Sequence, residues 1–279
     1  MQVSVSIVNM IQQMDFIGRE TQTGVALKQE QYEFWRPDTN GEHLYRSEPW
    51  QPTSKAMFRA SAPLKPVNYS SVNNLFNSFN DEELDNYKKY WEGVKPKNDT
   101  EIFHRWLFAF MSVHTTWERN VIGYEAIKNW TVWFKDDAKL MEIIKGAKVG
   151  LHNNRVRFIS QFAEKFWSNP EAYKYQDGSW QDFRDKLVKD ILGLGIAKVS
   201  FSLEMIYPNE AEVTCMDTHL FQAYGLDQSK DARRYKEIEN YWLDMCRMWN
   251  VPSYIARCIL WDKKQEQTDS RYWSYVLEN

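Results

Sequence analysis

The chain has 279 residues, enough for one large domain or two small ones, and a formal net charge of −3, which excludes a protein that coats nucleic acid by charge alone. Its three cysteines form no CxxC pair and its five histidines show no metal-ligand spacing, so we expect no disulfide framework, no metal and a reducing intracellular setting. No stretch approaches the roughly 18 apolar residues of a membrane span, which predicts a soluble protein.

The first part of the chain, residues 1–75, predicts an N-terminal arm of extended or irregular structure. Five of the nine prolines fall between residues 37 and 66, and the alternation of Val3, Val5 and Ile7 favours at most a short strand. We expect this arm to wrap the rest of the chain, and the pattern fits a small β element equally well.

From residue 81 onward, apolar residues recur at helical spacing. Leu84, Tyr87 and Trp91 share one helix face, and a longer stripe continues from Ile102 towards Tyr124. Turns containing glycine or proline separate further predicted helices at 136–146, 153–168, 180–190, 196–207, 218–224, 231–248 and 252–261. The body of the chain is therefore predicted to be all-α.

A tight turn, Gly193-Leu194-Gly195, lies between two of these predicted helices. Glycine lets the backbone turn sharply and approach a ligand closely, and the second helix would offer free N–H groups to a phosphate. Lys198, one turn into that helix, would add a cationic contact. The same pattern also fits a plain corner between two helices, so the turn alone leaves both interpretations open.

Asp217, followed by Thr218 and His219, opens the next predicted helix. The dipole and free N–H groups of a helix N-terminus stabilise an acidic side chain at this position. A carboxylate held there can stabilise positive charge that develops in a transition state. By itself, the residue also fits an ordinary helix cap.

Together these segments resemble the helix–hairpin–helix (HhH-GPD) DNA glycosylase superfamily, which includes relatives of endonuclease III and 8-oxoguanine glycosylase. Four segments carry the resemblance, in the family's order: Met111–Thr116, Gly150–Arg155, Leu192–Gly195 and Met216–His219. The resemblance covers roughly residues 101–225. It implies an all-α fold of two helical subdomains with a cleft between them, into which a target base is flipped.

The resemblance also implies a domain organisation. A glycosylase domain at 76–279 would follow the arm at 1–75, with a helical barrel at about 101–212 and a second subdomain from 76–100 and 213–279. Only Cys246 and Cys258 follow Asp217, too few for the iron–sulfur cluster of some relatives, so we expect no cofactor. The implied partner is double-stranded DNA with a damaged or modified base, and we expect a monomer that binds no membrane.

The implied activity is that of a DNA N-glycosylase, with Asp217 as the catalytic carboxylate and Gly193 and Gly195 gripping a DNA phosphate. Bifunctional members place a nucleophilic lysine two residues after the second hairpin glycine, where this chain has Ala197. One residue along a helix turns a side chain by about 100°, so Lys198 need not face the same site. We therefore expect a monofunctional enzyme in which Asp217 activates a water, with an AP lyase that uses Lys198 as an alternative.

Further DNA contacts are expected from five polar residues. His114 matches a position that fills the gap left by a flipped base in relatives, and the others lie at the starts of predicted helices: Asn153, Asn154, Arg155 and His219.

Two other functions remain open from the sequence. One is a diverged family member that acts on hypermodified thymine or another pyrimidine in viral DNA, which the displaced Lys198 and the unusual arm would suit. The other is a non-catalytic DNA-binding protein that keeps only the hairpin. We expect an intracellular location in each case, in the cytoplasm or nucleoid, or in a host cell if the protein is viral.

Overall fold

The computed structural model describes residues 65–264 and 276, and these residues contain helices and no strand. The α-helices are α3 (Ser70–Phe76), α4 (Asp81–Gly93), α5 (Asp99–Met111), α6 (Trp117–Ile127), α7 (Asp137–Gly146), α8 (His152–Ser168), α9 (Trp180–Asp190), α10 (Ile196–Ile206), α11 (Thr218–Ala223), α12 (Gln228–Asp231), α13 (Tyr235–Met248) and α14 (Ser253–Lys264). Short 3₁₀ turns lie at Trp130–Val132, Pro170–Tyr173 and Ala232–Arg234. The all-α prediction is confirmed for the described part.

Side-chain caps fix where many of these helices begin. In each case a side-chain oxygen just before the helix accepts a hydrogen bond from a backbone N–H of its first turn; the capping residues are Asn80, Asn98, Thr116, Asp136 and Ser179. Such a cap stabilises a helix by about 1 kcal/mol. The polar residues between the apolar stripes therefore determine the helix starts.

The long stripe predicted from Ile102 towards Tyr124 is interrupted in the structure. Helix α5 ends at Met111 and α6 begins at Trp117, with Thr116 as the cap of α6. In the loop between them, His114 has a left-handed backbone with φ of 49°, which a continuous helix cannot contain.

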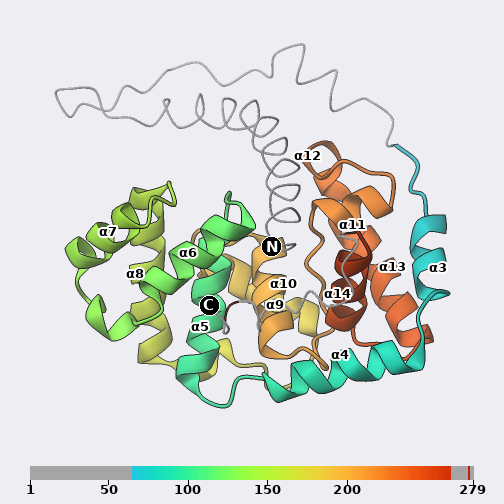
Figure 1. The fold of residues 1–279 in the computed structure, drawn as a ribbon, viewed down its shortest axis with the longest axis horizontal. Coiled ribbons are helices and arrows are strands. Elements are labelled where there is room, and N and C mark those ends of the chain that lie inside the picture. The colour runs from blue at the N-terminus through green and yellow to red at the C-terminus, as the bar shows by residue number, and fades with distance from the viewer. Residues whose placement is uncertain (1–64, 265–275, 277–279) are drawn as a thin grey trace, which may run out of the picture.

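The helices pack as two groups that meet at α10 (Figure 1). In the first helix group, α5 packs against α6, α8 and α10, while α7 packs on α8 and α9 on α10. In the second helix group, α13 packs against α3 and α14, and α14 also contacts α4. Helix α10 contacts α14 as well as α5 and α9, so it touches both groups. The helix that follows the glycine turn is therefore central to the fold.

Residues 70–76 differ from the sequence prediction of an extended arm up to residue 75. They form α3, whose side chains Val72, Leu75 and Phe76 are buried. The ring of Phe76 lies 5.2 Å from that of Trp242 on α13. Burying three apolar side chains at helical spacing favours a helix here. Residues 1–64, including the strand suggested by Val3, Val5 and Ile7, lie outside the described part.

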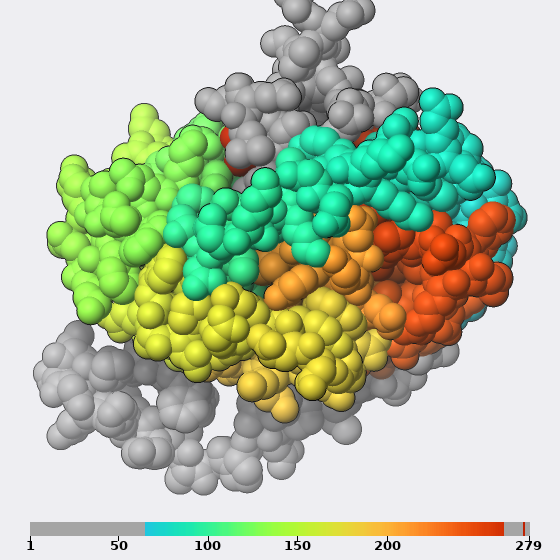
Figure 2. Space-filling model, turned by 90° about the horizontal axis from the view of Figure 1, so that it is seen from below, coloured from blue at the N-terminus to red at the C-terminus, as the bar shows by residue number. Residues whose placement is uncertain are grey.

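Large aromatic side chains fill the core of both groups. Phe103, Trp106 and Phe166 are fully buried in the first group, and Trp91 and Tyr254 in the second. Figure 2 shows α4 and α5 (teal) running across one face of the molecule, from the green helices of the first group to the orange-red helices of the second. Within the described residues, no helix is long and apolar enough to cross a membrane.

Candidate active site

The glycine turn predicted from the sequence is present and joins α9 to α10. Gly193 has a φ of 90°, a backbone conformation that suits glycine. Leu194 is buried and anchors the turn, while Gly195 precedes the first residue of α10 and provides no side-chain cap. A helix leaves its first backbone N–H groups without internal acceptors. The N-terminus of α10 is therefore available to an anion.

Gly193 also packs closely against the side chain of Phe158. A Cβ atom added at Gly193 would lie 2.3 Å from Cδ2 of Phe158 on α8, whereas one added at Gly195 meets nothing within 4 Å. We expect Gly193→Ala to destabilise the protein by about 1–3 kcal/mol, because it combines a strained φ with this clash, and Gly195→Ala to have little effect on stability. Chemical denaturation followed by helical circular dichroism measures both. Equal stability of the two variants would contradict the close packing against Phe158.

Asp217 is the N-cap of α11, and its two carboxylate oxygens have different partners. Its Oδ1 accepts hydrogen bonds from the backbone N–H groups of His219 and Leu220, at 2.9 and 3.0 Å. Its Oδ2 lies 3.5 Å from Nη1 of Arg257 on α14. The side chain is 25% exposed. One oxygen is thus fixed by the helix, while the other faces Arg257 in a side chain that keeps some solvent contact.

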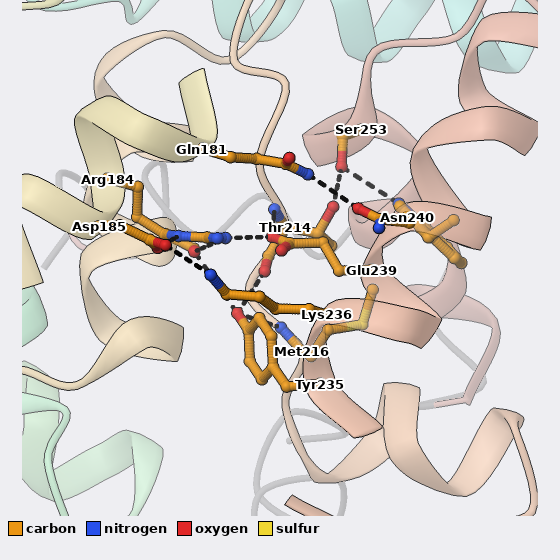
Figure 3. A network of polar contacts seen from close by, with 12 residues as sticks. Gln181, Arg184, Asp185, Thr214, Met216, Tyr235, Lys236, Glu239, Asn240 and Ser253 are labelled. Atoms are coloured by element: carbon orange, nitrogen blue, oxygen red, sulfur yellow. Dashed lines mark hydrogen bonds and ion pairs between the residues drawn. The ribbon is translucent and has the colours of Figure 1, made fainter. Parts of the chain in front are cut away.

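A buried network holds the segment that leads into Asp217 (Figure 3). The Tyr235 hydroxyl donates to the carbonyl oxygen of Thr214 and accepts from the N–H of Met216. The Thr214 hydroxyl shares a hydrogen bond of 2.6 Å with that of Ser253. Because both backbone groups and side chains of this segment are bonded to α13 and α14, the position of Asp217 is set by the second helix group.

The centre of this network is an ion pair without solvent contact. Arg184 on α9 donates to Oε1 of Glu239 on α13, and both side chains are 0% exposed. The same Glu239 oxygen accepts the N–H of Thr214 at 2.9 Å. This pair joins the helix before the hairpin to the segment before Asp217, so it connects the two predicted functional elements.

Lys198 lies in the same electrostatic environment as Asp217. Its Nζ is 5.8 Å from the centre of the Phe201 ring, and the guanidinium of Arg257 is 5.3 Å from that ring. Burial lowers the pKa of Lys198, although the nearby Asp217 carboxylate acts in the opposite direction. No direct contact between Lys198 and Asp217 is recorded among the described residues, so whether Lys198 faces the site stays a prediction.

Two charged residues at this site were missed by the sequence analysis. Glu204 on α10 and Arg257 on α14 form a buried ion pair, with Glu204 Oε2 at 2.9 Å from Nη2 and 3.1 Å from Nε of Arg257. Burial raises the pKa of Glu204 to about 7, against the effect of Arg257. Each charge has apolar residues directly before and after it along its helix, a pattern that indicates burial with a partner.

Arg155 is buried and its guanidinium bonds to backbone carbonyl groups. Its guanidinium is 4% exposed and donates to the carbonyl oxygens of Gly150, Phe110, Met111 and Val113. These contacts tie the start of α8 to the end of α5. The side chain therefore has its donors occupied by backbone, and we do not include Arg155 among the proposed DNA contacts.

The other predicted contact residues lie in separate places. Asn153 and Asn154 are exposed in the first turn of α8, and His114 is exposed in the loop between α5 and α6. His219 is partly buried in the first turn of α11, where its ring packs edge-on against Trp261 at 4.3 Å. Burial lowers the pKa of His219. Of these four residues, only His219 is adjacent to Asp217. Within the described residues, no three metal-ligating side chains gather at one point.

Comparisons with known proteins address the fold. No family model and no curated protein sequence matches the chain significantly. Among solved structures, the 8-oxoguanine glycosylase/lyase of Methanocaldococcus jannaschii in complex with a 15mer DNA containing 8-oxoguanine matches with a TM-score of 0.55 and 19% identity, over 72% of this chain and 98% of that one.

Two further structures agree. Another crystal structure of the M. jannaschii 8-oxoguanine DNA glycosylase gives a TM-score of 0.52 at 18% identity, covering 71% of this chain and 89% of the other. The 8-oxoguanine DNA glycosylase of Thermotoga maritima gives 0.51 at 17% identity, covering 72% and 94%. The helices described here therefore have the fold of 8-oxoguanine DNA glycosylases.

Proposed function

We propose that this protein is a DNA N-glycosylase that releases a damaged or modified base from duplex DNA. The observation that carries the proposal is the position of Asp217, whose carboxylate caps the start of α11 through one oxygen and has Arg257 at 3.5 Å from the other. The three solved structures reported above are 8-oxoguanine DNA glycosylases, so 8-oxoguanine is the first base to test.

The proposed reaction uses the two elements in sequence. The turn at Gly193–Gly195 and the N–H groups that begin α10 bind a DNA phosphate, and the target nucleotide leaves the base stack. As the bond between base and sugar breaks, positive charge develops on the sugar. The carboxylate of Asp217 stabilises this charge through its Oδ2 atom and orients a water molecule for attack.

A base-release screen tests this proposal. Duplexes with single 8-oxoguanine, alkylated, deaminated, oxidised-pyrimidine and hypermodified-pyrimidine sites are incubated with the full chain, and free base is measured by mass spectrometry. Release of any of these bases supports a glycosylase, and release only from hypermodified pyrimidine favours the viral-DNA alternative. Binding to duplex without release of any base would overturn the proposal and favour a non-catalytic DNA-binding protein.

A second candidate reaction would use Lys198, whose Nζ faces the same Phe201 ring as the guanidinium of Arg257, the ion-pair partner of Asp217. Its neutral amine would bond to C1′ of the sugar as the bond to the base breaks, and the base would leave with the bonding electrons and take up a proton. Transfer of a proton from Nζ to O4′ would then open the ring and leave a protonated Schiff base on the DNA. This would make the protein a glycosylase with lyase activity.

Borohydride reduction distinguishes the two reactions, because it converts a Schiff base into a stable protein–DNA adduct. If Lys198 is the nucleophile, we expect the adduct to disappear in Lys198→Met and to form increasingly as the pH rises. The sign follows from the amine, which reacts only when neutral; because burial lowers the pKa of Lys198, this rise begins at lower pH than for an ordinary lysine.

Lys186 provides a matched control, because it is an exposed lysine on α9, before the turn. Lys186→Met should form as much adduct as the parent. Base release without any adduct in the parent would leave hydrolysis by an Asp217-activated water as the reaction, and an adduct that survives Lys198→Met would assign the nucleophile to another amine.

A further inference from the structure

Asp217 has a fixed cationic neighbour that the proposed chemistry does not require. Among the residues that the structure describes, Arg257 is the cation within ion-pair distance of the Asp217 carboxylate, with Nη1 at 3.5 Å from Oδ2. Oδ2 is also the oxygen left free by the helix cap. A cation at this oxygen would oppose the stabilisation of a positively charged sugar, so its presence needs a physical explanation.

Arg257 is held in place on several sides. Its guanidinium lies 5.3 Å from the ring centre of Phe201 and 5.1 Å from that of Tyr254. Its Nε and Nη2 atoms face the Glu204 carboxylate at 2.9 to 3.2 Å. The side chain is 4% exposed. Arg257 is thus bound more closely to Glu204 than to Asp217, and it cannot follow Asp217 if that side chain turns.

The three side chains form a row in which the guanidinium of Arg257 lies between the carboxyl groups of Glu204 and Asp217. Because the pKa of Glu204 is raised to about 7, its carboxyl group is mainly ionised above that pH. Arg257 alone would oppose the charge of Asp217, and the Glu204 carboxylate, when ionised, compensates Arg257. The guanidinium can then orient Oδ2 as its ion-pair partner at 3.5 Å, while Glu204 limits the loss of the negative potential that a cationic transition state requires.

We propose that Arg257 is a positioning residue for Asp217 and that Glu204 preserves the negative charge of the site by compensating Arg257. This inference rests on the proposed glycosylase function. It assigns separate roles to the two residues: Arg257 determines where Oδ2 points, and Glu204 determines how strongly the site attracts a cation.

Two DNA ligands distinguish the effect of charge at the site from the effect of the position of the Asp217 Oδ2 atom. Duplexes with a cationic pyrrolidine or a neutral tetrahydrofuran abasic-site analogue differ mainly in charge at the sugar, so the ratio of their dissociation constants reports the potential at Asp217. We expect Glu204→Gln, which keeps the shape and removes the charge, to lower the preference for pyrrolidine by about tenfold. The double variant Glu204→Gln/Arg257→Met should restore the preference, because both buried charges are then absent.

Single-turnover base release provides the second readout. The double variant should recover the preference for the cation and still release base more slowly than the parent, since Oδ2 is no longer held. Asp262→Asn is the control: it neutralises another buried carboxylate of α14, whose partner is Tyr87 on α4. This control should leave both readouts near the parent values, and denaturation curves identify any variant that is unfolded.

The outcomes separate the two proposals. If the parent releases base but Glu204→Gln leaves the affinity ratio unchanged, charge compensation by Glu204 is wrong. If the double variant releases base at the parent rate, positioning by Arg257 is wrong. A purely structural role would weaken both analogues equally and would also overturn the inference. If the parent neither releases base nor prefers either analogue to plain duplex, the glycosylase function itself fails.

Discussion

Asp217→Asn should lower the rate of base release by at least about 100-fold, while binding to duplex DNA and the stability of the protein stay close to the parent values. The Asn oxygen can still accept the backbone N–H groups of His219 and Leu220, so α11 keeps its cap. What is lost is the negative charge beside the sugar. Single-turnover base release and duplex binding, measured on the same preparation, test both parts of this expectation.

Asp227→Asn is the matched control for this substitution. Asp227 caps α12 through a hydrogen bond from the Ser229 N–H, so the same change is made at another helix start. Its effect on base release should be small. A parent-like rate in Asp217→Asn would show that another group provides the catalytic carboxylate, and equal losses in both variants would show that the effect of Asp217 is only structural.

The two elements on which this prediction depends could be read from the sequence because each is local. The turn at 193–195 requires a left-handed residue between two apolar helical patterns, and glycine at Gly193 meets that requirement. The cap at Asp217 requires a short acceptor side chain immediately before a helix. Neither conclusion depends on the position of distant parts of the chain.

The charged residues around Asp217 could not be placed in the same way. The register of Lys198 gives its angle around α10 relative to a family pattern, but its electrostatic coupling to Asp217 depends on how α10 packs against α11 and α14. Glu204 and Arg257 lie far apart in sequence on helices that meet only in the fold. A charge flanked on both sides by mainly apolar residues predicts burial with some partner, and only tertiary structure identifies which one.

Arg155 is a residue whose burial the sequence pattern does not reveal. A polar stretch at a predicted helix start is typical of an exposed surface, and Asn153 and Asn154 are exposed as this pattern suggests. Arg155, one position further, turns inward and caps the C-terminal carbonyl groups of α5. The end of α5 has unsatisfied backbone oxygens that need donors, and the sequence does not show that α8 begins next to them.

The buried pair of Arg184 and Glu239 should have the largest effect on stability. Arg184→Met leaves the Glu239 carboxylate buried without its cation, and we expect a loss of about 3–5 kcal/mol in the free energy of unfolding. Adding Glu239→Gln to this variant should recover part of the loss, because the neutral amide can still accept the Thr214 N–H. Chemical denaturation of the single and double variants measures the difference.

Arg247→Met is the control, since Arg247 pairs with Glu212 and Asp244 in partly exposed positions where an ion pair contributes about 0–1 kcal/mol. If the two arginine variants lose the same stability, the pair at Glu239 is not the buried support that its geometry indicates. If Arg184→Met is less stable than Arg247→Met, its rate of base release should also be measured under conditions in which it remains folded. Glu239 accepts the N–H of Thr214, which lies three residues before Asp217. Removing Arg184 should therefore displace the segment that positions the Asp217 carboxylate and slow base release.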